Sequence, residues 1–311
     1  MIRRKKIIKV ILITLLVLVV ILTGAGFYIL DYSLSPDDGR ADVDSAFVRL
    51  YENYPESQAW VDSLKEIHAL RDTFAVMPSG ERHHAYYINN GSRSTALVLH
   101  GWRDSAIKYL FLARIYDKEL GYNIVLPDIY AHGQSEGDVI RMGWLDRLDM
   151  VRWLQMFPHD TVVVHGVSMG GATAMMMSGD PVPDGVKDIR FVADCGYTSV
   201  WDEFKGELKN QFGLPSFPLL DAASMLCGIR YGWTFKEASA LEQVKLCKQP
   251  MLFIHGDSDT FVPTEMVYRL YEAKPQPKEL WITKGTEHAL SYKNHPDEYI
   301  QKVKEFCKKQ Y

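Results

Sequence analysis

A serine between two glycines is the residue of this 311-residue sequence that most suggests covalent chemistry. Ser168 lies in the sequence Gly-Val-Ser-Met-Gly, residues 166–170, after the apolar run 161–165 and before a helix-forming stretch that begins at Ala172. A strand, a tight turn and a helix in this order expose the serine hydroxyl at the carboxyl end of a sheet. The glycines leave room where strand and helix approach each other. A serine hydroxyl is a weak nucleophile at neutral pH, so this chemistry needs a histidine base and a carboxylate.

Both partners follow Ser168 in the required order, first the acid and then the histidine. The apolar run 251–256 ends in a loop with Asp257 and Asp259, and the run 279–283 ends in a loop with His288. Asp259 lies two residues further along its loop and can reach back toward a histidine above the sheet edge, so we favour it over Asp257. Asp194, at the end of the preceding apolar run, is interpreted as a capping or turn residue. The sequence therefore predicts Ser168 as nucleophile, His288 as base and Asp259 as the acid.

Attack on an acyl group also creates an oxyanion, which requires hydrogen-bond donors. We assign this role to the backbone N–H groups of Met169, directly after the serine, and of Trp102, in the loop after the run 95–100. His132 is expected to shape the site rather than to move protons. His100, His165 and His255 are expected to bond backbone groups at strand ends. The sequence shows no recognisable metal-ligand spacing and no nucleotide-binding motif, so neither a metal nor a cofactor is predicted.

Alternating short β-rich runs and longer helix-like stretches position these residues. Continuous apolar runs are typical of parallel strands that are covered on both faces. The sequence predicts helices over 142–156, where Trp144, Leu148, Val151 and Leu154 repeat at helical spacing, and over 264–273. We predict an α/β fold with a mostly parallel eight-stranded sheet flanked by helices. The predicted strands are 73–77, 84–88, 95–100, 123–127, 161–165, 189–193, 250–255 and 279–283.

One interval is too long for a single crossover helix. More than fifty residues separate the run ending at Ala193 from the one beginning at Pro250. Pro215 and Pro218 divide this interval into short helical pieces that are rich in aromatic residues. We expect a helical lid insertion at about residues 200–245, covering an apolar pocket. The alternative is that these aromatic residues form a small core of their own.

The N-terminus predicts a membrane anchor. Residues 1–9 are basic, and residues 10–30 are uncharged. At ~1.5 Å per residue, the uncharged stretch reaches roughly 30 Å, the thickness of the hydrocarbon core. The basic flank is expected to stay in the cytoplasm, which places the domain of residues 72–311 outside it. A cleaved signal peptide and a peripheral arrangement remain alternatives, and residues 31–71 are either a stalk or an early helical layer.

The charge of the chain argues against nucleic-acid binding, and its cysteine content bears on disulfides. Thirty-five Lys and Arg residues against 39 Asp and Glu give a net charge of −4, and basic residues cluster only at the N-terminus. Binding to nucleic acid is therefore not expected. The four cysteines are predicted to be buried thiols, with disulfides as the minority alternative.

Together these motifs resemble the α/β-hydrolase superfamily from about residue 72 to the C-terminus. The N-terminal anchor and residues 194–199 further resemble bacterial membrane-anchored serine hydrolases of the esterase or prolyl-aminopeptidase-like group. The resemblance implies the same roles for Ser168, Asp259 and His288. The residues that carry it are His100-Gly101, Asp128 with Gly133-Gln134-Ser135, residues 166–171, His255-Gly256-Asp257-Ser258-Asp259 with Val262-Pro263, and His288.

The leading interpretation is a membrane-tethered serine hydrolase that cleaves carboxylic esters, with a small-molecule ester or acyl compound as substrate. Prolyl aminopeptidases of this superfamily often carry tryptophan after the nucleophile, whereas this chain has Met169, which favours an ester. A peptidase or a thioesterase on the same three residues is the alternative among enzymes. A domain that binds a ligand or partner without catalysis is the alternative from a different class.

Overall fold

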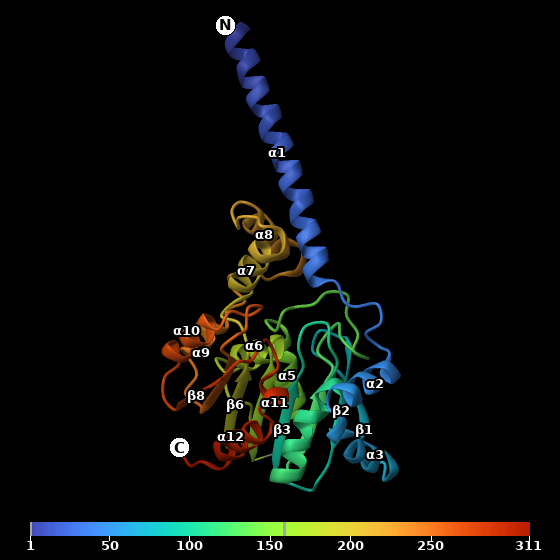
Figure 1. Ribbon diagram of the computed structural model, residues 1–311. Helices are drawn as coiled ribbons and strands as arrows, with labels where there is room; N and C mark the ends of the chain where they lie inside the picture. The colour runs from blue at the N-terminus through green and yellow to red at the C-terminus, as the bar shows by residue number, and fades with distance from the viewer. Residues whose placement is uncertain (1, 158–159) are drawn as a thin grey trace.

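One mixed sheet organises the protein. In a computed structural model that describes residues 2–157 and 160–311, eight strands pair in the order β1-β2-β4-β3-β5-β6-β7-β8 (Figure 1). β2 is antiparallel to β1 and β4, and the other pairs are parallel. The strands are β1 Arg71–Val76, β2 Arg82–Ile88, β3 Ser94–Leu99, β4 Asn123–Pro127, β5 Thr161–Val167, β6 Asp188–Asp194, β7 Met251–Gly256 and β8 Lys278–Thr283. Each predicted strand is present with its ends within two residues, so the predicted α/β sheet is confirmed.

Helices cover both faces of the sheet, which explains why its central strands are apolar throughout. Side chains alternate along a strand, so Leu97 and Leu99 of β3 join one core while Ala96 and Val98 join the other. The first core is covered by α5 Asp146–Gln155, α6 Met169–Met177, α9 Ala240–Val244 and α10 Glu265–Ala273. The second is covered by α2 Val43–Asn53, α3 Gln58–Glu66, α4 Leu110–Ile115 and α12 Pro296–Lys308. Short helical turns lie at Pro55–Ser57, Ala106–Tyr109, Tyr116–Leu120 and, as α11, Ser291–Asn294.

The helix predicted over 142–156 begins later than expected. α5 starts at Asp146, because Met142 and Gly143 have φ angles of 49° and 81°, which do not belong to a right-handed helix. The Asp146 carboxylate instead accepts the Gly143 N–H at 2.8 Å. Of the four residues at helical spacing, Trp144 and Leu154 are buried, whereas Leu148 is half exposed. α5 buries Met150, Trp153 and Leu154.

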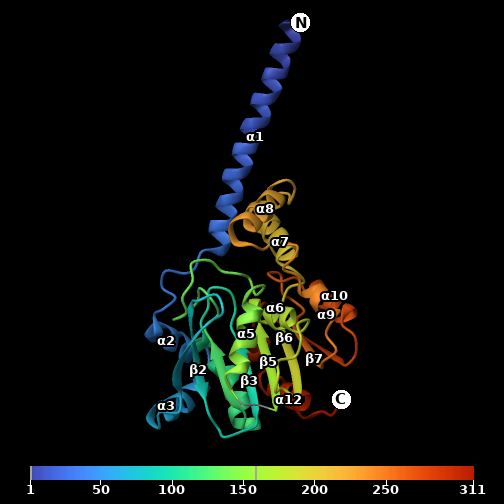
Figure 2. The ribbon, with the colours of Figure 1, turned by 180° about the vertical axis from the view of Figure 1, so that it is seen from behind.

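The segment before the sheet packs onto it through α2 and α3. Ala46, Leu50 and Trp60 join the same core as Ile88 of β2. The indole N–H of Trp60 donates to the Asp117 carboxylate at 2.8 Å and so ties α3 to the turn after α4. Residues 43–66 therefore lie against the domain (Figure 2).

Three further helices stand above the carboxyl ends of the strands. α1, Ile2–Leu34, projects away from the domain, and its most apolar window has no buried residues. Its last turns enter the core through Leu30 and Leu34. α7, Val200–Phe212, and α8, Leu219–Tyr231, form what we call the lid, and α8 lies beside α1 in both views (Figures 1 and 2).

Candidate active site

The turn at Ser168 is strained in the way that the motif requires. Ser168 has φ 57° and ψ −120° between β5 and α6, a conformation that side chains rarely adopt. A Cβ added at Gly166 would lie 2.0 Å from the Gly170 carbonyl oxygen, and one added at Gly170 would lie 2.3 Å from that of Leu99. Both glycines are therefore required by close backbone approach. Ser168 is half-buried and lies directly after the carboxyl end of β5.

His288 connects this hydroxyl to a carboxylate. Its Nε2 lies 2.8 Å from Ser168 Oγ, and its Nδ1 lies 2.7 Å from Asp259 Oδ2. The other carboxylate oxygen, Asp259 Oδ1, accepts the backbone N–H groups of Phe261 and Val262 at 3.0 and 2.9 Å. These bonds fix the carboxylate, so that Nδ1–H of His288 donates to it and Nε2 is free to accept the Ser168 proton.

A second histidine also faces Asp259. His255 Nε2 lies 2.9 Å from the Val262 carbonyl and 3.3 Å from Asp259 Oδ2. A carbonyl only accepts, so Nε2 carries the proton. Burial alone would raise the pKa of Asp259, but the hydrogen bonds with His255 and His288 offset it and lower the pKa to about 2. His255 thus bonds the backbone, as predicted, and also supports Asp259, which was not predicted.

The two competing carboxylates lie elsewhere. Asp257 is exposed and accepts the Gly285 N–H at 2.7 Å, which shapes the loop before His288. Asp194 is buried, and its carboxylate accepts the hydroxyls of Tyr299 and Ser291 at 2.9 and 3.3 Å. Burial raises the pKa of Asp194 to about 6. The expectation that Asp194 is a capping or turn residue was wrong, because its partners come from α11 and α12.

His165 also differs from expectation. We expected its ring to bond backbone groups, but its two nitrogens face the hydroxyls of Tyr116 and Tyr299, both at 2.9 Å. Those partners lie 49 and 134 residues away in sequence, so no local pattern indicates them. The ring is fully buried, which lowers its pKa to about 3. His165 therefore acts as a neutral link between the sheet and α12.

The loop after β3 passes close to the serine. A Cβ added at Gly101 would lie 3.6 Å from the Ser168 Cβ, and Trp102 lines the same pocket as Ser168. The following Arg103 has φ 52°, and its N–H donates to His132 Nε2 at 3.0 Å. Burial lowers the pKa of His132 to about 3, which keeps this acceptor nitrogen unprotonated. His132 shapes the site, as expected.

Asp128 holds this loop from the neighbouring strand end, a role that sequence analysis left unassigned. Its carboxylate accepts the N–H groups of Ala106 and Gln134 at 2.8 and 2.9 Å and lies 2.7 Å from His84 Nδ1. A Cβ at Gly133, which has φ 47°, would lie 2.0 Å from the Asp128 Cγ. The Gly-Gln-Ser sequence after Asp128 was the available signal. Asp128 thus connects the loops after β3 and β4.

Comparison with known proteins agrees with this architecture. Residues 96–302 match the alpha/beta hydrolase family. The chain belongs to this family. It is 29% identical over 253 residues to the uncharacterized protein YqkD of Bacillus subtilis, over 79% of this chain and 82% of YqkD.

The chain is also similar to an esterase of known structure and to a lipase. The structure of the Pyrococcus furiosus esterase Pf2001 superimposes on this α/β-hydrolase with a TM-score of 0.62. The two sequences are 25% identical, and the match covers 78% of this chain and 94% of the esterase. The lysophosphatidylserine lipase ABHD12 of Danio rerio is 24% identical over 171 residues, which cover 52% of this chain and 42% of that protein. This α/β-hydrolase is thus a hydrolase by family, with an esterase among its structural neighbours.

A pocket of about 120 Å³ opens at Ser168 in this α/β-hydrolase. Aromatic side chains from the lid and from the loops line it, including Phe204 and Phe261. Two of its wall residues, Tyr32 and Ser33, come from the end of α1, which sequence analysis did not foresee. Glu203 of α7 also faces the pocket, and burial raises the pKa of its carboxyl well above the usual range. The pocket is thus mainly apolar, with the Glu203 carboxyl held in a desolvated position and Glu207 as a second carboxyl in its wall.

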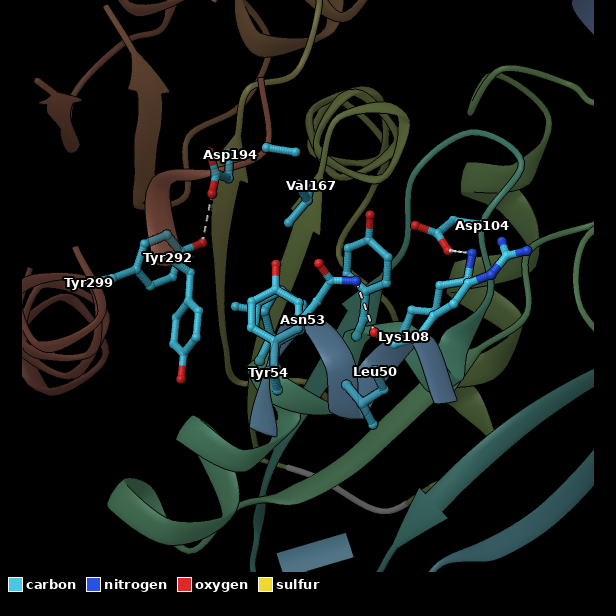
Figure 3. A pocket seen from close by; sticks show the side chains of 14 residues that line it. Leu50, Asn53, Tyr54, Asp104, Lys108, Val167, Asp194, Tyr292 and Tyr299 are labelled. Atoms are coloured by element: carbon cyan, nitrogen blue, oxygen red, sulfur yellow. Dashed lines mark hydrogen bonds and ion pairs between the residues drawn. The ribbon is translucent and has the colours of Figure 1, made fainter. Parts of the chain in front are cut away.

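A second cavity, of about 180 Å³, borders the residues next to the site (Figure 3). Val167 and Ala289 line it, but within the described chain its lining includes neither Ser168 nor His288. Asp194 with Tyr299 lies on one side, and the ion pair of Asp104 with Lys108 lies on the other (Figure 3). Since the serine hydroxyl faces the other pocket, that pocket is the candidate acyl-binding site.

The cysteines are buried free thiols throughout the described ranges, as expected. One of them, Cys195, places its sulfur within 4.8 Å of ligand atoms of Asp259 and His288. Burial raises the pKa of the Cys195 thiol well above its usual range, whereas metal ligation needs a thiolate. His288 Nδ1 is also already bonded to Asp259. The donor set therefore fits a proton-relay arrangement better than a metal centre.

Proposed function

We propose that this protein is a serine hydrolase that cleaves carboxylic esters through an acyl-enzyme intermediate. The observation that carries the proposal is the line of contacts from Asp259 through His288 to Ser168, at 2.7 and 2.8 Å. Three loops that are distant in sequence meet at one sheet edge to form it. A nucleophile, a base and an orienting acid in this geometry are the requirements of acyl transfer.

The reaction follows from these contacts. Ser168 Oγ attacks the ester carbonyl while His288 Nε2 takes the hydroxyl proton, and Asp259 stabilises the imidazolium through Nδ1–H. The backbone N–H groups of Trp102 and Met169 bind the oxyanion. His288 then gives its proton to the departing alkoxide as the carbon–oxygen bond breaks. A water molecule repeats the sequence on the acyl-enzyme and releases the carboxylic acid.

The substrate class is supported by three observations. The pocket at Ser168 is lined mainly by apolar and aromatic side chains, which suits an acyl group. The chain resembles an esterase at a TM-score of 0.62. It also carries Met169 after the serine. Rates on p-nitrophenyl esters, aminoacyl amides and acyl thioesters, measured on one preparation, test this assignment; a higher kcat/KM on the amides or the thioesters contradicts it.

We further propose that α1 anchors the enzyme in a membrane, with the hydrolase domain outside the cytoplasm. The apolar window of α1 is fully exposed in the described structure, so the protein itself does not cover it. Leu34 of the same helix is buried in the domain core. Alkaline carbonate extraction of membranes tests the anchor, which predicts that the intact chain stays in the pellet. N-terminal sequencing of that chain should begin at Met1 or Ile2, whereas a start after Gly26 would show a cleaved signal peptide.

A further inference from the structure

The end of α1 is part of the site rather than a tether beside it. Tyr32 and Ser33 form part of the wall of the Ser168 pocket. The Ser33 carbonyl accepts the indole N–H of Trp102 at 3.0 Å, and the Tyr32 carbonyl accepts the Arg103 guanidinium at 3.0 Å. If α1 spans the bilayer, as proposed above, the pocket therefore lies directly beneath the membrane surface.

The lid meets α1 inside its apolar stretch. A Cβ added at Gly26 would lie 2.7 Å from Leu226 Cδ1 and 3.4 Å from the Ala223 nitrogen, so α8 packs closely on this part of α1. Gly26 precedes Leu30, the end of the uncharged stretch, by four residues, or about 6 Å along the helix. α8 therefore lies at the level where α1 leaves the hydrocarbon.

The lid carries exposed apolar side chains at this level. Met225 and Ile229, one helical turn apart on α8, are 61% and 76% exposed, and Phe217 in the preceding loop is 75% exposed. Phe212 and Leu214, at the end of α7, are also exposed. A surface of this kind beside a membrane helix fits insertion among lipid headgroups and upper acyl chains. Its occupant is therefore the bilayer that holds α1.

A seam between α1 and α7 leads from the serine toward this surface. A smaller cavity of about 40 Å³ shares five residues with the Ser168 pocket: Tyr32, Ser33, Phe204, Glu207 and Gln211. The Tyr32 hydroxyl donates to Gln211 at 2.8 Å and so links α1 to α7 where the two cavities meet. The smaller cavity continues along the two helices to Tyr28 and Phe212. The lining is mostly aromatic and apolar, and both cavities are small. Their small volumes suit one hydrocarbon chain rather than two.

We propose that the enzyme draws its substrate from its own membrane, as a single-chain amphiphilic ester. The acyl chain lies in the seam between α1 and α7, and the ester carbonyl reaches Ser168. This inference rests on the proposed esterase function and adds the source and shape of the substrate. The lid surface of Phe217, Met225 and Ile229 holds the entrance against the bilayer.

The test uses the full chain reconstituted in phosphatidylcholine vesicles. A p-nitrophenyl ester of a long fatty acid is placed either in the enzyme's own vesicles or in separate vesicles, and p-nitrophenyl acetate is supplied in water. We expect hydrolysis of the long ester in the enzyme's own vesicles, and a rate lower by about tenfold or more in separate ones. Equal rates for both placements overturn the inference.

A lid variant separates membrane entry from catalysis. Met225→Glu with Ile229→Glu should lower the rate on the embedded long ester by about tenfold and leave kcat/KM for p-nitrophenyl acetate unchanged. Ile67→Glu is the matched control, since Ile67 is 70% exposed beyond the end of α3, on the domain and not on the lid. An unchanged embedded-ester rate in the lid variant contradicts the inference. If the unmodified enzyme does not hydrolyse p-nitrophenyl acetate, that result would instead contradict the proposed function.

Discussion

The indole N–H of Trp102 donates to the backbone carbonyl of Ser33 at 3.0 Å, which ties the loop that borders Ser168 to the last turn of α1. Trp102→Phe removes this bond but keeps the backbone amide that we assign to the oxyanion. We expect kcat on p-nitrophenyl acetate to fall by about threefold to tenfold, the range that corresponds to one hydrogen bond. An unchanged kcat in the folded variant would show that the end of α1 does not position the loop.

His132 is predicted to act as a fixed acceptor for the Arg103 N–H. Its pKa is lowered to about 3 by burial, below the ordinary value of ~6.5, so acid protonates the unfolded chain first. The stability that this group provides is complete above pH 6.5 and is lost as the pH falls toward 3. His132→Asn should flatten that part of the pH dependence of unfolding free energy, measured by urea denaturation in detergent. The same substitution at the exposed His68 is the control. If unfolding free energy depends on pH with the same slope in His132→Asn and in the unmodified protein, His132 does not have this role.

The carboxylate partner of His288 can be assigned by a matched pair of variants. Asp259→Asn should lower kcat by about 10⁴-fold, because the amide no longer holds the histidine in its correct tautomer. Asp257→Asn keeps an oxygen acceptor for the Gly285 N–H and should retain nearly full activity. With its pKa lowered to about 2, Asp259 stays ionised at pH 4 and above. Equal losses in the two variants would contradict the assignment.

Much of the fold follows from local patterns. Apolar runs predicted the strands, and the sequence around Ser168 predicted its turn, because Gly166 is required by its contact with Gly170 only four residues away. Asp259 and His288 were predicted from their order and from the strand ends that precede them. These signals are local, so a single sequence carries them.

Contacts between distant segments were not predictable in the same way. The start of α5 depends on a bond between Asp146 and Gly143 that competes with helical periodicity. His165 and Asp194 share a partner, Tyr299 of α12, which lies more than a hundred residues away from either residue. The approach of Tyr32 to the pocket required the position of α1 relative to the lid. Each of these features is set by tertiary packing.

Glu203 is expected to make stability depend on pH. Burial raises the pKa of this carboxyl well above its ordinary value, so the folded protein holds a proton that the unfolded chain has released. Glu203 does not destabilise the protein below about pH 4, the ordinary pKa of a carboxyl group. The free energy of unfolding decreases as the pH rises above this value. Glu203→Gln should therefore gain unfolding free energy relative to the unmodified protein at pH 8, and little at pH 4. Glu272→Gln, an exposed residue of α10, is the control; a gain of equal size at both pH values would refute the explanation.

Ester hydrolysis by Ser168→Ala, combined with fluorophosphonate labelling, determines whether Ser168 is the nucleophile. The unmodified enzyme should incorporate the probe on Ser168 and lose its activity in parallel. The variant should take up no probe and should hydrolyse p-nitrophenyl acetate several orders of magnitude more slowly, with an unchanged circular dichroism spectrum. Substantial ester hydrolysis by the folded variant would show that Ser168 is not the nucleophile.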